Sequence, residues 1–142
     1  MKIKDVMTRN VAAVDVADNV MKAAAIMKEH NVGSVPVCDS NRVAGIITDR
    51  DITLRTVAAG LDVKSQAVRD VMSTNPVVGQ PEMDVTDAAK LMGDKQIRRL
   101  PIIEKNGLVG IVSLGDLALE PALKNETEEA LSQISEQSTP EY

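Results

Sequence analysis

The chain has 142 residues, a formal net charge of −5 and 44% hydrophobic residues, which suits one compact domain or two small halves that share a core. The acidic balance argues against a nucleic-acid-binding protein, and the absence of Phe and Trp removes the side chains on which bases stack. No segment approaches the roughly 20 apolar residues of a membrane span, so we expect no membrane association.

The first half of the chain predicts a strand, a helix, two strands and a second helix. Asp18-Asn19 offers a cap for the first helix, and Thr48 caps the second, which Gly60 ends. A short polar turn joins the second and third strands, which predicts a β-hairpin. The predicted strands are 11–14, 34–38 and 43–47.

The same order returns in the second half, because the sequence repeats at an offset of 65 positions. Residues 5–52 align with residues 70–117 without a gap, and 13 of the 48 pairs are identical. This predicts two β-α-β-β-α modules of the α/β (α+β) class, packed about a pseudo-twofold axis. The expected elements of the second half are strands at 76–78, 99–103 and 108–112 and helices near 84–94 and from 114.

The expected boundaries follow from the repeat. They are 1–60 for the first module, 61–67 for a polar linker, 68–122 for the second module and 123–142 for an acidic, partly disordered tail. In the tail, Ala130, Leu131 and Ile134 are spaced for one short amphipathic helix. We expect this tail to be a solvated terminus, with disorder over residues 135–142, and the alternative is an interaction role.

Each module ends in an apolar strand followed by Thr/Ser-x-x-Asp. The residues are Thr48 and Asp51 in the first half and Ser113 and Asp116 in the second. Free N–H groups at a helix start attract phosphate, a carboxylate can accept hydrogen bonds from ribose hydroxyls, and Gly45 or Gly110 allows close backbone approach. The pattern therefore indicates a ribonucleotide site presented twice. It equally fits a capping box, in which the side chains satisfy only the helix's own donors.

Longer motifs resemble those of the cystathionine-β-synthase-type (CBS) domain family, in the tandem pair called a Bateman module. They are DVMT and DVMS, VGSVPV and IRRLPI, and GIITDRDI and GIVSLGDL. The residues of these motifs are similar to those of small stand-alone bacterial CBS proteins, including hypoxic-response proteins. The resemblance implies a regulatory, non-enzymatic binder of AMP, ADP, ATP or another adenosine compound, acting as a homodimer on an unknown protein effector.

The resemblance also implies roles for individual residues. Thr48, Asp51, Ser113 and Asp116 would hold phosphate and ribose, and residues around two strands of each half would flank the base. These flanking residues are Val11, Val35, Pro36, Val77, Leu100 and Pro101. Arg98, where the first half has Gly33, would reach phosphate in the site of Asp51 and make that site the tighter one. The other interpretation is that Arg98 and Arg99 solvate a strand end or pair with acids.

Few other residues of the sequence suggest a disulfide, a metal site or an active site. Cys38 cannot form an internal disulfide, and the N-terminal residues lack the apolar run of a signal peptide, so we expect a cytoplasmic protein. Cys38 and His30 are too few for an expected metal site. No nucleophile motif, P-loop or dinucleotide fingerprint indicates an enzyme. The alternatives are a ligand-free interaction or scaffold protein and a metal- or redox-responsive stress protein.

Overall fold

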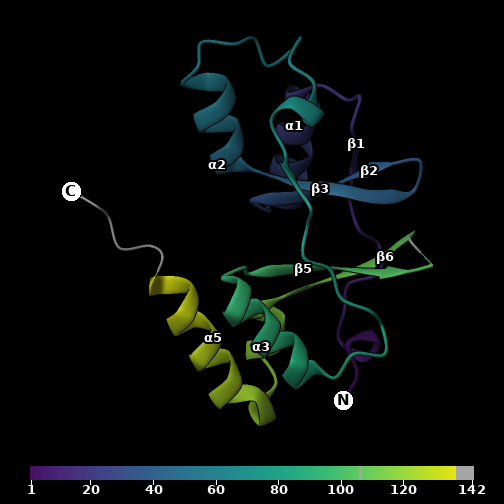
Figure 1. Cartoon of the computed structure of the whole chain (residues 1–142), viewed down its shortest axis with the longest axis vertical. Helices are drawn as coiled ribbons and strands as arrows, with labels where there is room; N and C mark the ends of the chain where they lie inside the picture. The colour runs from purple at the N-terminus through teal and green to yellow at the C-terminus, as the bar shows by residue number, and fades with distance from the viewer. Residues whose placement is uncertain (106, 137–142) are drawn as a thin grey trace. The chain divides into compact units, whose positions relative to one another are not determined.

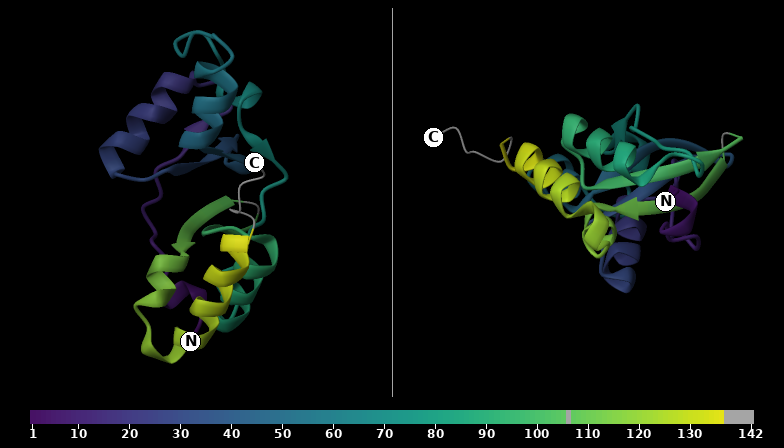
Figure 2. Two further views of the ribbon diagram at one scale, coloured as in Figure 1. Left: turned by 90° about the vertical axis from the view of Figure 1, so that its left-hand side faces the viewer. Right: turned by 90° about the horizontal axis from the view of Figure 1, so that it is seen from below.

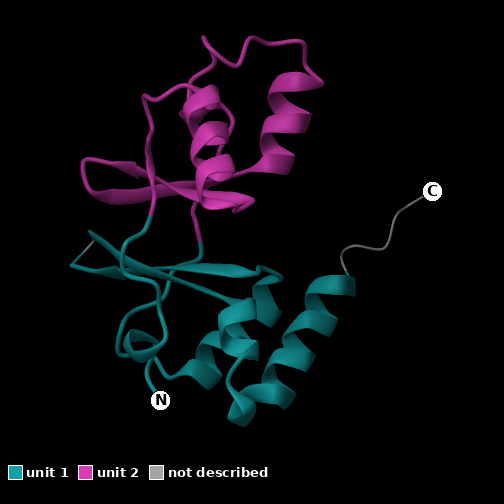
Figure 3. Cartoon of the chain, turned by 180° about the vertical axis from the view of Figure 1, so that it is seen from behind, with its two compact units in different colours: residues 1–11, 77–142 teal, residues 12–76 magenta. Residues whose placement is uncertain are grey.

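A computed structural model describes residues 1–105 and 107–136, and they form two compact units (Figures 1 and 3). Unit 2 comprises residues 12–76, and unit 1 comprises residues 1–11 together with 77–142. The first eleven residues therefore belong to the unit that contains the second repeat. The segment that precedes Val77 likewise belongs to the unit that contains the first repeat.

Unit 2 contains the predicted β-α-β-β-α order. The Asn19 side chain accepts a hydrogen bond from the Lys22 N–H (2.9 Å) and begins the first helix, which ends at Asn31 in the left-handed conformation (φ 53°). This confirms the predicted cap. The elements are β1 (Val14–Asp15), α1 (Val20–His30), β2 (Ser34–Asp39), β3 (Arg42–Thr48), α2 (Asp49–Ile52) with a π-helical turn at Thr53–Val57, and β4 (Ser73–Thr74).

The β2–β3 hairpin forms the centre of the unit 2 sheet, which confirms the predicted hairpin. β1 pairs in parallel with β2, and β4 pairs antiparallel with β3. The core lies between this hairpin and α1, because the strands alternate and α1 presents its apolar residues on one side. Its fully buried members include Val20, Ala23, Val35, Val37 and Ile47.

Unit 1 repeats the helix, hairpin and helix and adds a C-terminal helix. Its elements are α3 (Val85–Lys95), β5 (Arg99–Glu104), β6 (Gly107–Ser113), α4 (Leu114–Ala118) and α5 (Lys124–Glu136). The bulge that shifts the β2–β3 register at Val37/Cys38 recurs in the β5–β6 hairpin at Ile102/Ile103, the repeat-related pair.

The strand predicted at 76–78 is absent from the structure, and the prediction was wrong. A single bridge from Gly79 to Ile102 of β5 stands beside the predicted position, and the bridge from Thr8 to Ile111 of β6 is the counterpart of the β3–β4 pairing in unit 2. The short extended segments of both halves pair only where a hairpin edge offers backbone groups, so their register depends on tertiary contacts rather than on their own apolar residues.

Helix α5 lies along α3 (Figures 1 and 2). Ala130 and Ile134 are 1% and 6% exposed and belong to the same hydrophobic core as Met92 of α3. The expectation of a solvated terminus is therefore wrong for residues 124–136, because the apolar stripe of α5 is long enough to bury against α3. The disorder expected at 135–142 falls mostly on residues 137–142, which lie outside the described residues.

Candidate functional site

The β3–α2 junction brings Thr48 and Asp51 of unit 2 together. The Asp51 N–H donates to the Thr48 hydroxyl oxygen (3.0 Å), and the Thr48 N–H donates to Oδ2 of Asp51 (3.0 Å). This reciprocal pair is a capping box, which satisfies two donors that the helix start would otherwise leave unpaired. The motif therefore caps the helix in this structure, and the cap uses one of the two carboxylate oxygens of Asp51.

The β6–α4 junction of unit 1 repeats this geometry. The Asp116 N–H donates to Oγ of Ser113 (3.0 Å), and the Ser113 N–H donates to Oδ2 of Asp116 (3.1 Å). Both aspartates are half-buried. The two junctions therefore present the same hydroxyl and carboxylate at the end of a buried strand.

A second backbone contact also repeats. The Asp49 N–H donates to the carbonyl oxygen of Gly33 (2.9 Å), and the Leu114 N–H donates to that of Arg98 (2.8 Å). Residue 33 or 98 is consequently fixed beside the junction of its own unit. The predicted contact of Arg98 with phosphate at Asp51 joins residues of two units and stays a prediction.

A strand glycine, Gly45 or Gly110, precedes each junction and lies against the backbone of another segment of the chain. A Cβ on Gly45 would collide with the carbonyl oxygen of Ser73, and one on Gly110 would lie 3.0 Å from that of Thr8. Ser73 and Thr8 occupy repeat-related positions in the DVMS and DVMT segments. The close approach that the sequence suggested is therefore made by the chain itself, and these glycines carry no argument for a ligand.

The predicted base-flanking residues fall into two groups. Four of them are buried in the hairpins, and Val35 and Leu100 belong to the two hydrophobic cores, so a ligand at these strands would meet mainly backbone. The other two, Val11 and Val77, are half-buried. No ligand is present to test their role, which stays a prediction. The buried four are Val35, Pro36, Leu100 and Pro101.

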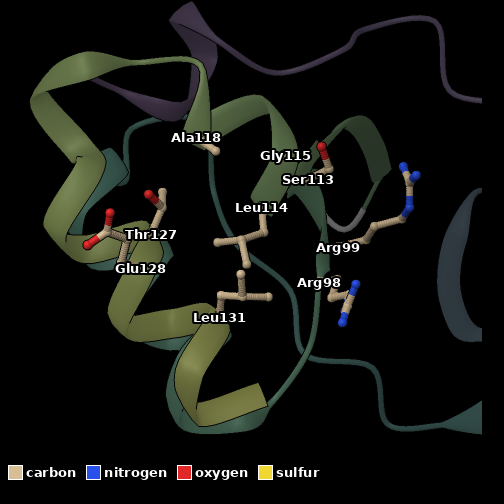
Figure 4. Close-up of a pocket in the computed structure, with 9 residues that line it drawn as sticks. All are labelled: Arg98, Arg99, Ser113, Leu114, Gly115, Ala118, Thr127, Glu128 and Leu131. Atoms are coloured by element: carbon tan, nitrogen blue, oxygen red, sulfur yellow. The ribbon is translucent and has the colours of Figure 1, made fainter. Parts of the chain in front are cut away.

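A cavity of about 450 Å³ opens beside Ser113 in unit 1 (Figure 4). Leu114 of α4 and Leu131 of α5 face one another across it, and Arg98 and Arg99 lie on the side opposite α5. The guanidinium groups of both arginines point away from the two leucines. Sequence reasoning missed the α5 wall, although the helical spacing of Ala130, Leu131 and Ile134 was its available signal.

The two residues considered for metal binding are His30 and Cys38. His30 is exposed at the end of α1, and Cys38 is half-buried in β2. Burial raises the pKa of the Cys38 thiol, and the negative charge of Asp15 raises it further. Among residues 1–105 and 107–136, no three His, Cys, Asp or Glu side chains are grouped so that they could hold a metal ion.

One further finding concerns the helices. Within the part of the chain that the structure describes, none of them combines the length and the apolar character that crossing a bilayer requires.

Comparison with known proteins supplies the family. The family model of the CBS domain matches twice, at residues 3–56 and 68–122. The chain is 48% identical to CBS domain-containing protein YhcV of Bacillus subtilis, over 95% of this chain and 96% of that protein.

Solved structures agree with this assignment. The crystal structure of Hypoxic Response Protein I with two coordinated zinc ions has a TM-score of 0.78 at 31% identity, covering 84% of this chain and 98% of that one. A CBS domain protein from Pyrobaculum aerophilum, complexed with AMP, has a TM-score of 0.79 at 25% identity, covering 90% and 98%. The chain therefore belongs to the CBS domain family and carries two CBS repeats.

Proposed function

We propose that this protein is a regulatory CBS pair that binds AMP, ADP or ATP and transmits the ligand state to a protein effector. The observation that carries the proposal is the duplicated junction, in which a half-buried carboxylate gives Oδ2 to the capping box. Its Oδ1 remains as an acceptor for ribose hydroxyls. The AMP held by the Pyrobaculum relative supports an adenosine ligand for this chain.

The proposed residues keep the roles that the sequence suggested. Thr48 and Asp51 hold the phosphate and ribose of one ligand, and Ser113 and Asp116 hold those of the other. Arg98 supplies positive charge to a phosphate group, because a charge-assisted hydrogen bond to an anion is about twice as strong as a neutral one. The base lies against backbone near Pro36 and Pro101.

Regulation requires that the ligand distinguish two states of the protein. A ligand shifts such an equilibrium only by its difference in affinity for the two states, so the effector must read a conformation that the nucleotide favours. We propose a cytoplasmic homodimer as the working form, without enzymatic activity of its own.

Isothermal titration calorimetry with AMP tests the proposal. Asp51→Asn and Asp116→Asn keep an oxygen for the cap but remove the carboxylate charge, and each should weaken one site about tenfold or more. Asp87→Asn, on the exposed side of α3, is the matched control and should bind AMP as the wild type does. Wild-type affinity in the Asp51→Asn/Asp116→Asn double variant would refute the assigned site.

A thermal-shift panel tests the ligand class. A ligand at 100 times its dissociation constant stabilises the folded state by about 2.7 kcal/mol. AMP, ADP and ATP should raise the melting temperature, with zinc chloride included because a structural relative coordinates zinc. A shift with zinc alone would favour the metal-responsive alternative over nucleotide binding.

A further inference from the structure

Arg55 connects the Asp51 carboxylate to a distant segment of unit 2. Its guanidinium Nη1 donates to the carbonyl oxygens of Val71 (2.8 Å) and Met72 (3.3 Å). The same nitrogen lies 3.7 Å from Oδ1 of Asp51, the oxygen that the capping box does not use. Arg55 thus holds the π-helical turn that follows α2 against the segment that leads into β4, while facing the carboxylate.

The contact with Asp51 orients the carboxylate without consuming its hydrogen-bonding capacity. A separation of 3.7 Å exceeds the range of an N–H···O hydrogen bond, so the attraction is electrostatic and the lone pairs of Oδ1 stay available. The Asp51 side chain is 13% exposed but that of Arg55 is 51% exposed, so water screens the attraction in part and its strength is that of an exposed charge pair. Two fixed points, Thr48 on Oδ2 and Arg55 near Oδ1, therefore restrict the rotation of this carboxylate.

Unit 1 lacks the second fixed point. The residue related to Arg55 by the repeat is Glu120, whose N–H donates to the carbonyl oxygen of Leu117 (3.0 Å) just beyond α4. A carboxylate cannot donate to the carbonyl groups of Val6 and Met7, the counterparts of Val71 and Met72, and its negative charge cannot form an ion pair with Asp116. Among the described residues, Asp116 forms no ion pair.

We propose that Arg55 is a positioning residue that sets ribose recognition at Asp51, and that Glu120 leaves the Asp116 site with weaker ribose recognition. The inference rests on the proposed nucleotide-binding function and assigns the two sites different specificity. Ribose hydroxyls bind well only to an acceptor that is already oriented, because orienting it during binding costs free energy. The Asp51 site should therefore discriminate more strongly between ribose and a sugar without the 2′ and 3′ hydroxyls.

The test compares AMP with 2′,3′-dideoxy-AMP by calorimetry, so that phosphate and base are identical and only the hydroxyls differ. Each site is measured alone, the Asp51 site in an Asp116→Asn background and the Asp116 site in an Asp51→Asn background. In the first background, Arg55→Met should lower the AMP preference about two- to fivefold, the range for an exposed charge pair, and Arg55→Lys should restore most of it. In the second, Glu120→Arg should raise the preference by a similar factor.

The outcomes separate the proposal from a purely structural role. If Arg55 only stabilises the fold, Arg55→Met weakens both ligands equally and the ratio stays constant, which overturns the proposal. Glu120→Arg, at a half-buried position of the other unit, decides the question if Arg55→Met does not fold. AMP binding that depends on Asp51 but has a ratio insensitive to residues 55 and 120 overturns this inference alone. A wild-type protein that binds no adenosine nucleotide overturns the proposed function as well.

Discussion

Gly45 of β3 lies so close to Ser73 that a Cβ on the glycine would overlap the Ser73 carbonyl oxygen. The repeat-related pair in unit 1 is Gly110 and Thr8. In both units, a strand glycine makes room for the DVM segment with which the other repeat begins. The neighbouring backbone leaves no room for a side chain at either position, which explains why both residues are glycine.

Replacing Gly45 with alanine should destabilise unit 2. The new Cβ would overlap the Ser73 carbonyl oxygen and lie 2.9 Å from the Met72 sulfur, so the β3–β4 pairing must shift. Overpacking of this kind costs about 1–3 kcal/mol, measurable as a lower free energy of unfolding in urea. Gly115→Ala is the control, since its Cβ would meet only Oγ of Ser113 at 3.7 Å and alanine favours the α4 helix. Equal stability of Gly45→Ala and the wild type would contradict this account.

Gly93 should control the docking of α5 on α3. A Cβ at this position would lie 3.0 Å from Cα of Ala130 and would overlap the Gln133 side chain. Gly93→Leu should therefore displace α5, with faster amide hydrogen exchange over residues 124–136 and a loss of about 1–3 kcal/mol in unfolding free energy.

The repeat offers a matched control for Gly93. The equivalent residue of α1 is Lys28, whose side chain is exposed, so Lys28→Leu adds the same side chain where it has room. This variant should change stability by less than about 0.5 kcal/mol, because exposed substitutions rarely do more. Unchanged protection of α5 in Gly93→Leu would show that the helix does not depend on the missing side chain.

Cys38 should react slowly with thiol reagents at neutral pH. Burial and then the Asp15 charge raise the pKa of this thiol, and only the thiolate is nucleophilic. The midpoint of the pH–rate profile with a disulfide reagent should therefore lie above about 8.5, the ordinary value for cysteine. Folding favours the neutral form of the Cys38 thiol. Its contribution to the stability of the folded state is therefore full below the ordinary pKa and is lost as the pH rises through the raised pKa.

A charge substitution separates the two causes at Cys38. Asp15→Asn should lower the midpoint only in part, because burial is the larger cause, and Asp39→Asn at the exposed end of β2 should leave it unchanged. A midpoint at or below the ordinary value would identify Cys38 as a reactive thiol and would support the redox-responsive alternative.

Much of the fold was predictable because its signals are local. Asn19 and Lys22 lie three residues apart, as do Thr48 and Asp51, and bonds of that span depend on little beyond the neighbouring backbone. The hairpins followed from short turns between apolar runs. The predictions of a strand at 76–78 and of a solvated terminus over residues 124–136 were wrong, because strand pairing and helix burial there depend on partners far along the chain.

The candidate site divides in the same way. The sequence by itself determined the repeat, the order of helices and strands and the paired hydroxyl and carboxylate at each junction, since these depend on periodicity and on contacts within one turn. Only the tertiary structure decided which backbone covers Gly45, that α5 buries its apolar stripe on α3 and that Arg55 reaches Val71. These contacts join residues 16 or more positions apart, and no local preference specifies such a meeting until the chain has collapsed around its two cores.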